Sequence, residues 1–142
     1  MSFLFSVGAN IIGAFVGFGF AIMLQLRTEQ KKRANTVNKV LLSIVEELTD
    51  ISTSIQEYIR VKQPLTQRVP VPAWETALYS GIILELIDYK IYHSTIRAYS
   101  LIKVLNESIG SDTNKEDFFL LMKDIVDTSH EIIRDAQILI KK

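Results

Sequence analysis

The sequence has no cysteine, and its 142 residues include only three prolines and six glycines. Without cysteine, disulfide bonds, thiol catalysis and zinc sites with cysteine ligands are excluded. Common catalytic signatures are missing as well: there is no glycine-rich phosphate loop, no GxSxG and no HExxH. We therefore predict no catalytic, cofactor-binding or metal site, and we expect that the protein is not an enzyme.

Charged side chains are absent from Ser2 to Leu26. At roughly 1.5 Å per residue, a helix from Phe3 to Leu26 would extend about 36 Å, and a bilayer hydrocarbon core is about 30 Å thick. A cleaved signal peptide is the competing interpretation, but no basic residue precedes the apolar run and the run is too long. A buried core helix is disfavoured because the run is apolar on all sides. We expect residues 1–26 to form an uncleaved transmembrane helix.

Small residues recur every four positions in this segment, and two of them form a GxxxG pair, Gly13 and Gly17. A stripe of small residues lets two membrane helices approach closely. Asn10 lies beside the stripe, and because an unpaired amide in lipid is costly it should face another helix or water. The sequence offers no second apolar segment, so the expected partner is another copy. A monomeric anchor with incidental glycines is the alternative. The predicted oligomerisation or pore face comprises Ser6, Ala9, Asn10, Gly13, Gly17 and Ala21.

A basic collar occupies residues 27–36, in which Glu29 is the one acidic residue. This charge asymmetry predicts that the N-terminus lies outside and the C-terminal part lies in the cytoplasm. The collar can also contact anionic lipid head groups, at about 1 kcal/mol per basic side chain; a topology signal alone is the alternative. Most acidic residues lie beyond the collar, so general nucleic-acid binding is not expected. The predicted head-group contacts are Arg27, Lys31, Lys32 and Arg33.

Residues 37–142 have the periodicity of helices. No Gly or Pro lies between Arg27 and Gln63, so the membrane helix can continue into the next one. Three prolines in residues 61–73 then end the helix. We interpret this stretch as a connector between antiparallel helices, with a Pro-rich protein ligand as the alternative. A four-three apolar spacing, typical of a coiled coil or narrow bundle helix, is formed by Val37, Leu41, Ile44, Leu48, Ile51, Ile55 and Tyr58.

Three more helices are predicted after the prolines. A short one covers 74–86, with an interruption near Ser80-Gly81, and a longer one covers 88–109, with Gly110 as its stop. Residues 113–116 (TNKE) fit a capping box before the last helix. The apolar stripes of the two longer helices are Ile91, Thr95, Ala98, Ile102, Leu105 and Ile109, and Phe118, Met122, Ile125, Ser129, Ile132, Ala136 and Leu139. The predicted fold class is all-α, with an N-terminal transmembrane helix and a cytosolic antiparallel helical bundle over 37–142.

Two groups of side chains resemble sites without completing one. Di-iron bundles use a Glu-x-x-His pair on each of two helices, whereas Asp127-x-x-His130 stands alone here. A solvated helix face is the preferred interpretation, and an enzyme site around Asp127, His130 and Glu131 is kept as an alternative. Aromatic residues could form a ligand pocket, but at helical spacing they more often belong to a core. These aromatic residues are Trp74, Tyr79, Tyr89, Tyr92 and Tyr99.

The whole layout resembles a group of small bacterial membrane proteins that accompany phage-defence loci. Its landmarks are Trp74, Ser80-Gly81, Tyr99 and Leu105-Asn106. The accessory membrane protein of type VI-B CRISPR systems is similar in plan. The resemblance covers most of the chain as a layout rather than a motif, and it implies a degenerate HEPN-like bundle that assembles into a pore in the bacterial inner membrane. Neither histidine follows an arginine at the distance of the HEPN nuclease motif, so no functional residue carries over.

We therefore expect a homo-oligomeric, membrane-anchored effector that perturbs or perforates the membrane in bacterial antiviral defence. Its expected partners are membrane lipid, further copies of the chain and a cytosolic protein. The alternative is a membrane-tethered adaptor that docks a cytosolic partner. An adaptor should still work when the part from Ala34 onward is fused to an unrelated anchor.

Overall fold

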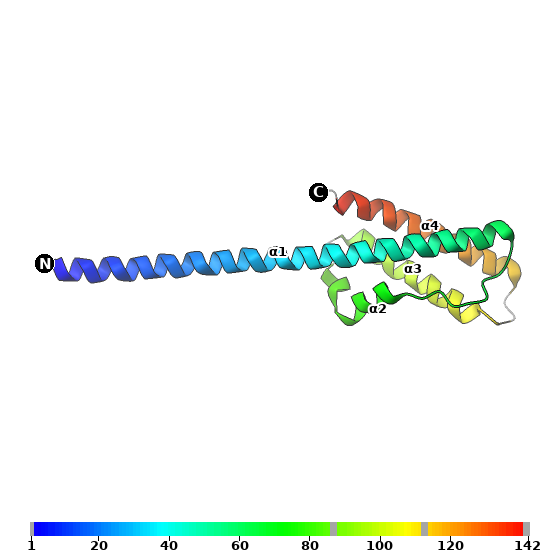
Figure 1. Ribbon diagram of the computed structural model, residues 1–142, viewed down its shortest axis with the longest axis horizontal. Coiled ribbons are helices and arrows are strands. Elements are labelled where there is room, and N and C mark those ends of the chain that lie inside the picture. Colours follow the sequence, from blue (N-terminus) through cyan, green and yellow to red (C-terminus); the bar gives the residue numbers. More distant parts are fainter. Residues whose placement is uncertain (1, 86–87, 112–113, 141–142) are drawn as a thin grey trace. The chain divides into compact units, whose positions relative to one another are not determined.

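The computed structural model describes the backbone of residues 2–85, 88–111 and 114–140, and the side chains of these ranges from residue 18 onward. No strand occurs in these ranges, so the described part of the chain is all-helical, as predicted. The chain divides into two units, Met1–Thr36 and Val37–Lys142. The elements are helix α1 (Ser2–Val61), helix α2 (Pro72–Tyr79), the 3-10 helix η1 (Ile82–Glu85), helix α3 (Tyr89–Ser108) and helix α4 (Lys115–Ile140) (Figure 1).

The first unit consists of the N-terminal part of α1. Each described side chain from residue 18 to residue 36 is exposed. Within the described residues, no helix combines the length and the apolar character needed to cross a membrane. The predicted transmembrane assignment of residues 1–26 thus has no support from the structure. Most side chains of that segment lie outside the described residues.

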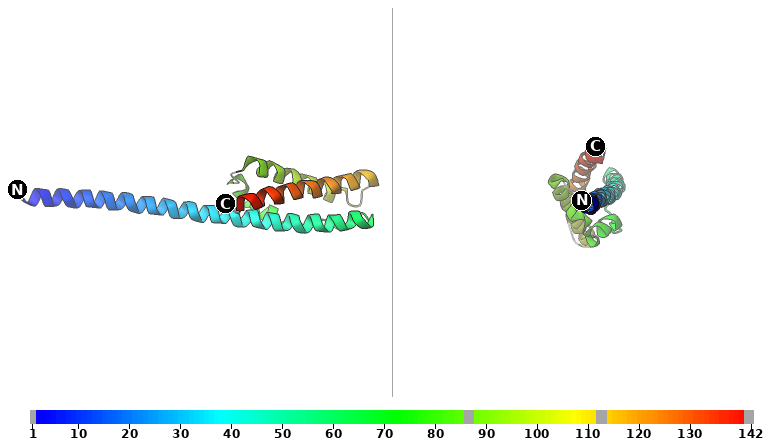
Figure 2. Two further views of the ribbon diagram at one scale, coloured as in Figure 1. Left: turned by 90° about the horizontal axis from the view of Figure 1, so that it is seen from above. Right: turned by 90° about the vertical axis from the view of Figure 1, so that its left-hand side faces the viewer.

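Residues 37–142 form the second unit, which we call the bundle domain. Helix α3 runs in the same direction as the adjoining part of α1, and α4 runs in the opposite direction to both (Figures 1 and 2). This arrangement is possible because an extended connection, residues 62–71, carries the chain back along the domain to α2. The predicted helical bundle is confirmed, but it is antiparallel only between α4 and the other two long helices; α1 and α3 run parallel because the extended connection returns the chain to the end of the domain where α3 begins.

The apolar stripe of α1 faces the core of the bundle domain, as its spacing predicts. Its five central positions are buried, and Val37 and Tyr58 at its ends are half-buried. The stripes of α3 and α4 also face the core, except at Leu139, which is 38% exposed. Here the prediction is wrong because a straight helix drifts by about 20° per heptad from a 3.5-residue repeat. By the last turn of α4 the inward position has moved to Ile140, which packs on a small apolar cluster.

Helix α1 ends where the prolines begin. Lys62 adopts a left-handed φ of 54°. Its N–H donates to the carbonyl of Ile59 at 3.2 Å, and the N–H of Gln63 donates to the carbonyl of Tyr58 at 3.1 Å. These two bonds form a Schellman motif, which satisfies carbonyls that the helix end leaves open.

The other helix boundaries follow from local caps. The Asp88 carboxylate accepts from the N–H groups of Lys90 and Ile91, at 2.9 and 3.1 Å, and so caps α3. Gly110 has a φ of +82°, which confirms it as the stop of α3. At α4 the cap is Asn114, whose side chain accepts from the N–H of Glu116 at 3.2 Å. The capping box was expected to use Thr113, which lies outside the described residues.

Among the described side chains, two hydroxyl groups are buried in the core without a hydrogen-bond partner. They belong to Thr95 on α3 and Ser129 on α4, and both residues are fully buried. A buried donor that makes no hydrogen bond costs about 1–3 kcal/mol. Both residues sit at stripe positions where an apolar side chain of similar size would fit.

Replacing these hydroxyls should stabilise the protein. We expect Thr95→Val and Ser129→Ala each to raise the free energy of unfolding by about 1 kcal/mol, because each removes an unsatisfied polar group without a large change of volume. Chemical denaturation of the purified chain, followed by circular dichroism, measures the effect.

Thr53→Val is the matched control for this prediction. The Thr53 hydroxyl is exposed and donates to the carbonyl of Thr49 at 2.8 Å, so its removal should give no gain in stability. Equal gains in the control and the core variants would mean that the buried hydroxyls carry no penalty.

Candidate functional site

The polar centre of the bundle domain is the Glu47 carboxylate on α1. One of its oxygens, Oε1, accepts from the Tyr99 hydroxyl at 2.6 Å and from the N–H of Trp74 at 3.3 Å. The other oxygen, Oε2, accepts from the N–H of Ala73 at 2.7 Å. One half-buried side chain therefore joins α1 to the start of α2 and the middle of α3.

The start of α2 needs an acceptor from outside its own segment. Val71, at the N-cap position, has no side-chain oxygen, and Pro72 begins the helix without an N–H group. The next two N–H groups of the first turn still require acceptors. The Glu47 carboxylate supplies them, and its negative charge also suits the positive end of the helix dipole.

An aromatic stack reinforces the same contact. The rings of Trp74 and Tyr99 lie parallel, with centroids 4.4 Å apart and 7° between their planes. Burial raises the pKa of the Tyr99 hydroxyl well above its usual value, and the hydrogen bond to the Glu47 carboxylate raises it further. Tyr99 thus stays a neutral donor over the whole ordinary pH range.

The extended connection is held by a second pair of hydrogen bonds. The Asn106 side chain accepts from the N–H of Val69 at 2.7 Å and donates to the carbonyl of Val69 at 2.9 Å. A bidentate contact of this kind fixes both the position and the orientation of the segment. We call the set of Glu47, Val69, Trp74, Tyr99 and Asn106 the clasp.

The clasp accounts for three of the landmarks that carried the family resemblance. Trp74, Tyr99 and Asn106 all hold the connection and α2 against the long helices. A fourth landmark, Ser80-Gly81, separates α2 from η1, and Gly81 has a φ of +70°. In this chain these landmarks build the fold. The three hydrogen bonds that Glu47 accepts position α2 and α3 against α1.

Among the surface grooves along the clasped connection, two share the Arg68 side chain. The groove toward α3, about 560 Å³, is lined in part by Arg68, Trp74 and Lys103. The groove toward α1, about 530 Å³, is lined in part by Glu46, Asp50 and Arg68. The Arg68 side chain therefore borders both.

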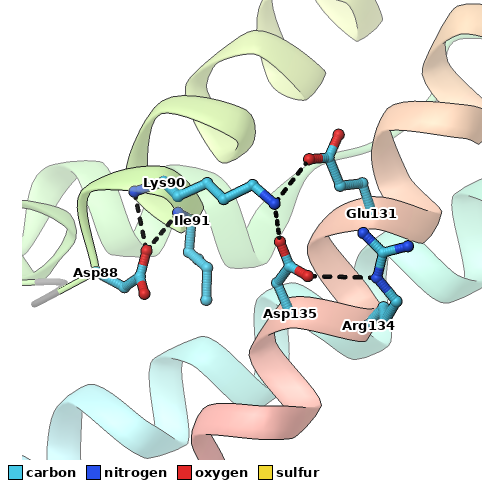
Figure 3. A network of polar contacts seen from close by, with 6 residues as sticks. All are labelled: Asp88, Lys90, Ile91, Glu131, Arg134 and Asp135. Atoms are coloured by element: carbon cyan, nitrogen blue, oxygen red, sulfur yellow. Dashed lines mark hydrogen bonds and ion pairs between the residues drawn. The ribbon is translucent and has the colours of Figure 1, made fainter.

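A second polar network joins the start of α3 to the last turns of α4 (Figure 3). The Lys90 ammonium group contacts Asp135 at 2.7 Å and Glu131 at 3.2 Å. The hydrogen bond from Lys90 lowers the pKa of Asp135, and the one from Arg134 lowers it further. Lys90 remains 60% exposed, so water screens these ion pairs. The network therefore helps to fix the position of α3 along α4 more than it adds to the free energy of unfolding.

The side chains of the alternative enzyme site do not converge. Glu131 faces Lys90, whereas the His130 ring lies 3.4 Å from the amide nitrogen of Gln56 on α1. Asp127 is exposed. Among the described residues, no group of three or more potential metal ligands lies together.

The five aromatic residues considered as a ligand pocket are dispersed. Trp74 and Tyr99 belong to the clasp, and Tyr92 packs against the core. Tyr79 and Tyr89 are 91% and 76% exposed. The core interpretation is therefore confirmed for three of the five and wrong for two.

The predicted oligomerisation face lies almost wholly outside the described side chains. Ala21 is its one described member, and it is exposed. The predicted head-group residues are all exposed: Arg27, Lys31, Lys32 and Arg33.

Sequence reasoning missed Glu47 and the contact that Asn106 makes with Val69. Both contacts join residues far apart in the chain, 26 to 52 positions for Glu47 and 37 for Asn106. A signal was present at α2, because a helix that begins Val71-Pro72 lacks a local cap. The sequence could predict the need for an acceptor, but not which acidic residue supplies it.

No protein-family model, curated protein or solved structure matches the chain. The class that the structure defines is an all-helical protein with a bundle domain. The likeness to CRISPR accessory membrane proteins remains a prediction from layout.

Loss of the Glu47 carboxylate should destabilise the bundle domain. We expect Glu47→Ala to lower the free energy of unfolding by about 2–3 kcal/mol, because it leaves the Tyr99 hydroxyl and two N–H groups without their charged acceptor. Urea denaturation measures the change. Glu46→Ala, at the exposed neighbouring position, is the control and should change little; an equal loss there would contradict the role assigned to Glu47.

Tyr99 should make stability depend on alkaline pH. The folded chain keeps its proton, whereas in the unfolded chain Tyr99 ionises near its ordinary pKa of about 10. Its contribution is therefore complete below about pH 10 and is lost progressively as the pH rises further. We expect a shallower alkaline decline of unfolding free energy in Tyr99→Phe than in the native chain. Identical slopes would show that Tyr99 is not protected from ionisation.

Proposed function

We propose that the protein is a membrane-anchored homo-oligomer, an effector whose clustered N-terminal helices perturb the bilayer. The observation that carries this proposal is a run of large apolar side chains on α1 that nothing in the described part of the chain covers. Their exposures range from 43% to 67%, and the residues are Phe18, Phe20, Ile22, Met23, Leu24 and Leu26. Apolar surface of this extent marks contact with a membrane or another protein.

The arrangement of these side chains around the helix favours lipid as their main neighbour. At about 100° per residue they are spread over most of the circumference. The largest gap, about 120° wide between Leu24 and Phe18, holds Ala21 and Gln25. A helix that is apolar on nearly every side suits a bilayer. The gap suits close approach of a second helix.

Self-association is supported by the position of Ala21 in this gap. Ala21 also belongs to the predicted oligomerisation face, and it continues the every-fourth-residue pattern of Gly13 and Gly17. Without a hydrophobic drive between helices in lipid, close packing of small residues is what associates them. Asn10 lies beside the same pattern, where a copy or a water-filled lumen can satisfy its amide.

The basic collar supports the proposed orientation. Arg27, Lys31 and Lys32 are exposed directly after the apolar run, where anionic head groups of the inner leaflet can neutralise them. The bundle domain then faces the cytoplasm. The pore and antiviral parts of the proposal rest on Asn10 and on the resemblance in layout.

Bulk on the small-residue face should prevent assembly. We expect Gly13→Ile combined with Gly17→Ile to convert the oligomer in detergent to a smaller species, because β-branched side chains keep the helices apart. Size-exclusion chromatography with light scattering measures the mass, and ion flux from loaded liposomes measures membrane perturbation. The oligomer and the ion flux should be lost together.

Gly19→Ile is the control, since it adds the same kind of side chain to the same helix outside the predicted face. A Cβ atom added at Gly19 meets nothing within 4 Å in the described part of the chain. This variant should assemble and conduct like the native chain. An unchanged mass in the double variant would refute the proposed interface. Retained assembly without any ion flux in the native chain would instead favour the membrane-tethered adaptor.

A further inference from the structure

The most exposed large side chains of the bundle domain, among those described, gather around the turn between α2 and α3. Tyr79, at the end of α2, is 91% exposed, and Leu84 in η1 is 75% exposed. Tyr89, the first residue of α3, is 76% exposed. The Tyr89 ring packs on His93, with centroids 4.1 Å apart, yet most of its surface stays exposed. Such exposure is uncommon for three large side chains in one short segment.

This segment lies at one particular end of the bundle domain. A small apolar cluster there joins Leu41 near the start of the domain, Ile91 in the first turn of α3 and Ala136 near the end of α4. The Lys90 contacts with Asp135 and Glu131 place the same elements side by side. Figures 1 and 2 show α2, the start of α3 and the end of α4 at this end of the domain.

The sequence sets an upper limit on the distance between the apolar N-terminal run and the first residue of the domain. Leu26 ends that run and Val37 begins the domain, so eleven residue steps separate them. Even fully extended, these steps span no more than about 37 Å. Val37 lies at the same end as Leu41, and that end is therefore the part of the domain that the chain can bring nearest to a bilayer.

The chemistry of the exposed segment fits the interfacial layer of a membrane. Tyrosine is enriched there because its ring is apolar and its hydroxyl remains hydrated, and leucine can enter the acyl region. The segment carries two acidic residues, Glu85 and Asp88, and Lys90 directly after Tyr89 is paired with Asp135 and Glu131. The segment thus offers no excess of positive charge to anionic lipid, in contrast to the basic collar, and we expect the contact to be apolar.

We propose that Tyr79, Leu84 and Tyr89 insert into the interface of the bilayer that holds the N-terminal segment, so that the bundle domain has a second, independent membrane contact. This inference rests on the proposed membrane anchoring. It assigns a function to the exposed residues that follow α2, the helix that the clasp holds through Trp74 and Tyr99.

The absence of cysteine makes a direct test possible, because a single introduced cysteine labels one site. Leu84→Cys in the full chain is labelled with an environment-sensitive fluorophore and reconstituted into phosphatidylcholine vesicles, with or without brominated acyl chains. We expect strong loss of emission in the brominated vesicles. The loss should persist at high salt and should not increase when anionic lipid is added.

Leu120→Cys is the matched control. Leu120 is 61% exposed on the same domain. Ile138 lies near the end of α4, at the same end of the domain as the exposed segment. Leu120 precedes it by eighteen residues, which is about 27 Å along the helix. Its label should keep the emission of a water-exposed site and should show no quenching by brominated lipid.

The possible outcomes separate this inference from the proposed function. If the chain stays with the vesicles after alkaline carbonate but the label at 84 is as unquenched as the label at 120, the second contact is refuted and the anchor stands. A label at 84 in apolar surroundings without quenching would show that a protein, not lipid, covers the segment, and would also refute it. If carbonate releases the chain from the vesicles, the anchor itself is refuted.

Discussion

The bundle domain depends on one carboxylate that serves three partners from two other helices. Helix α2 has eight residues, which is too short for stability on its own, and it has no cap within its own segment. Glu47 supplies that cap and at the same time holds the Tyr99 hydroxyl. The position of α2, and with it the exposed segment that follows, is therefore set by a residue on α1.

The long helices could be predicted because the sequence features that define them lie within a few neighbouring residues. A four-three apolar spacing needs only neighbouring residues to be recognised, and nearly all of the predicted stripe positions of α1, α3 and α4 face the core. The prolines and Gly110 mark helix ends for equally local reasons. Asp88 caps α3 from the adjacent position, where a boundary was expected.

The clasp could not be predicted because its contacts join residues that lie far apart in the sequence. Glu46, Glu47 and Asp50 look alike in sequence, and only the packing of α2 against α1 makes Glu47 the acceptor. The hydrogen bonds of Asn106 likewise depend on where the extended connection passes. The aromatic residues divide for the same reason: stacking partners bury Trp74 and Tyr99, whereas Tyr79 has none and stays exposed.

The connection between α1 and α2 is held at isolated points. Leu65 is buried, Val69 is bound by Asn106 and Ala73 by Glu47, while residues 66–68 between the first two points are exposed. A cut in that short exposed stretch would break no contact of the core. The two resulting pieces would each retain part of the interface, and the new ends would emerge beside the two grooves that Arg68 borders.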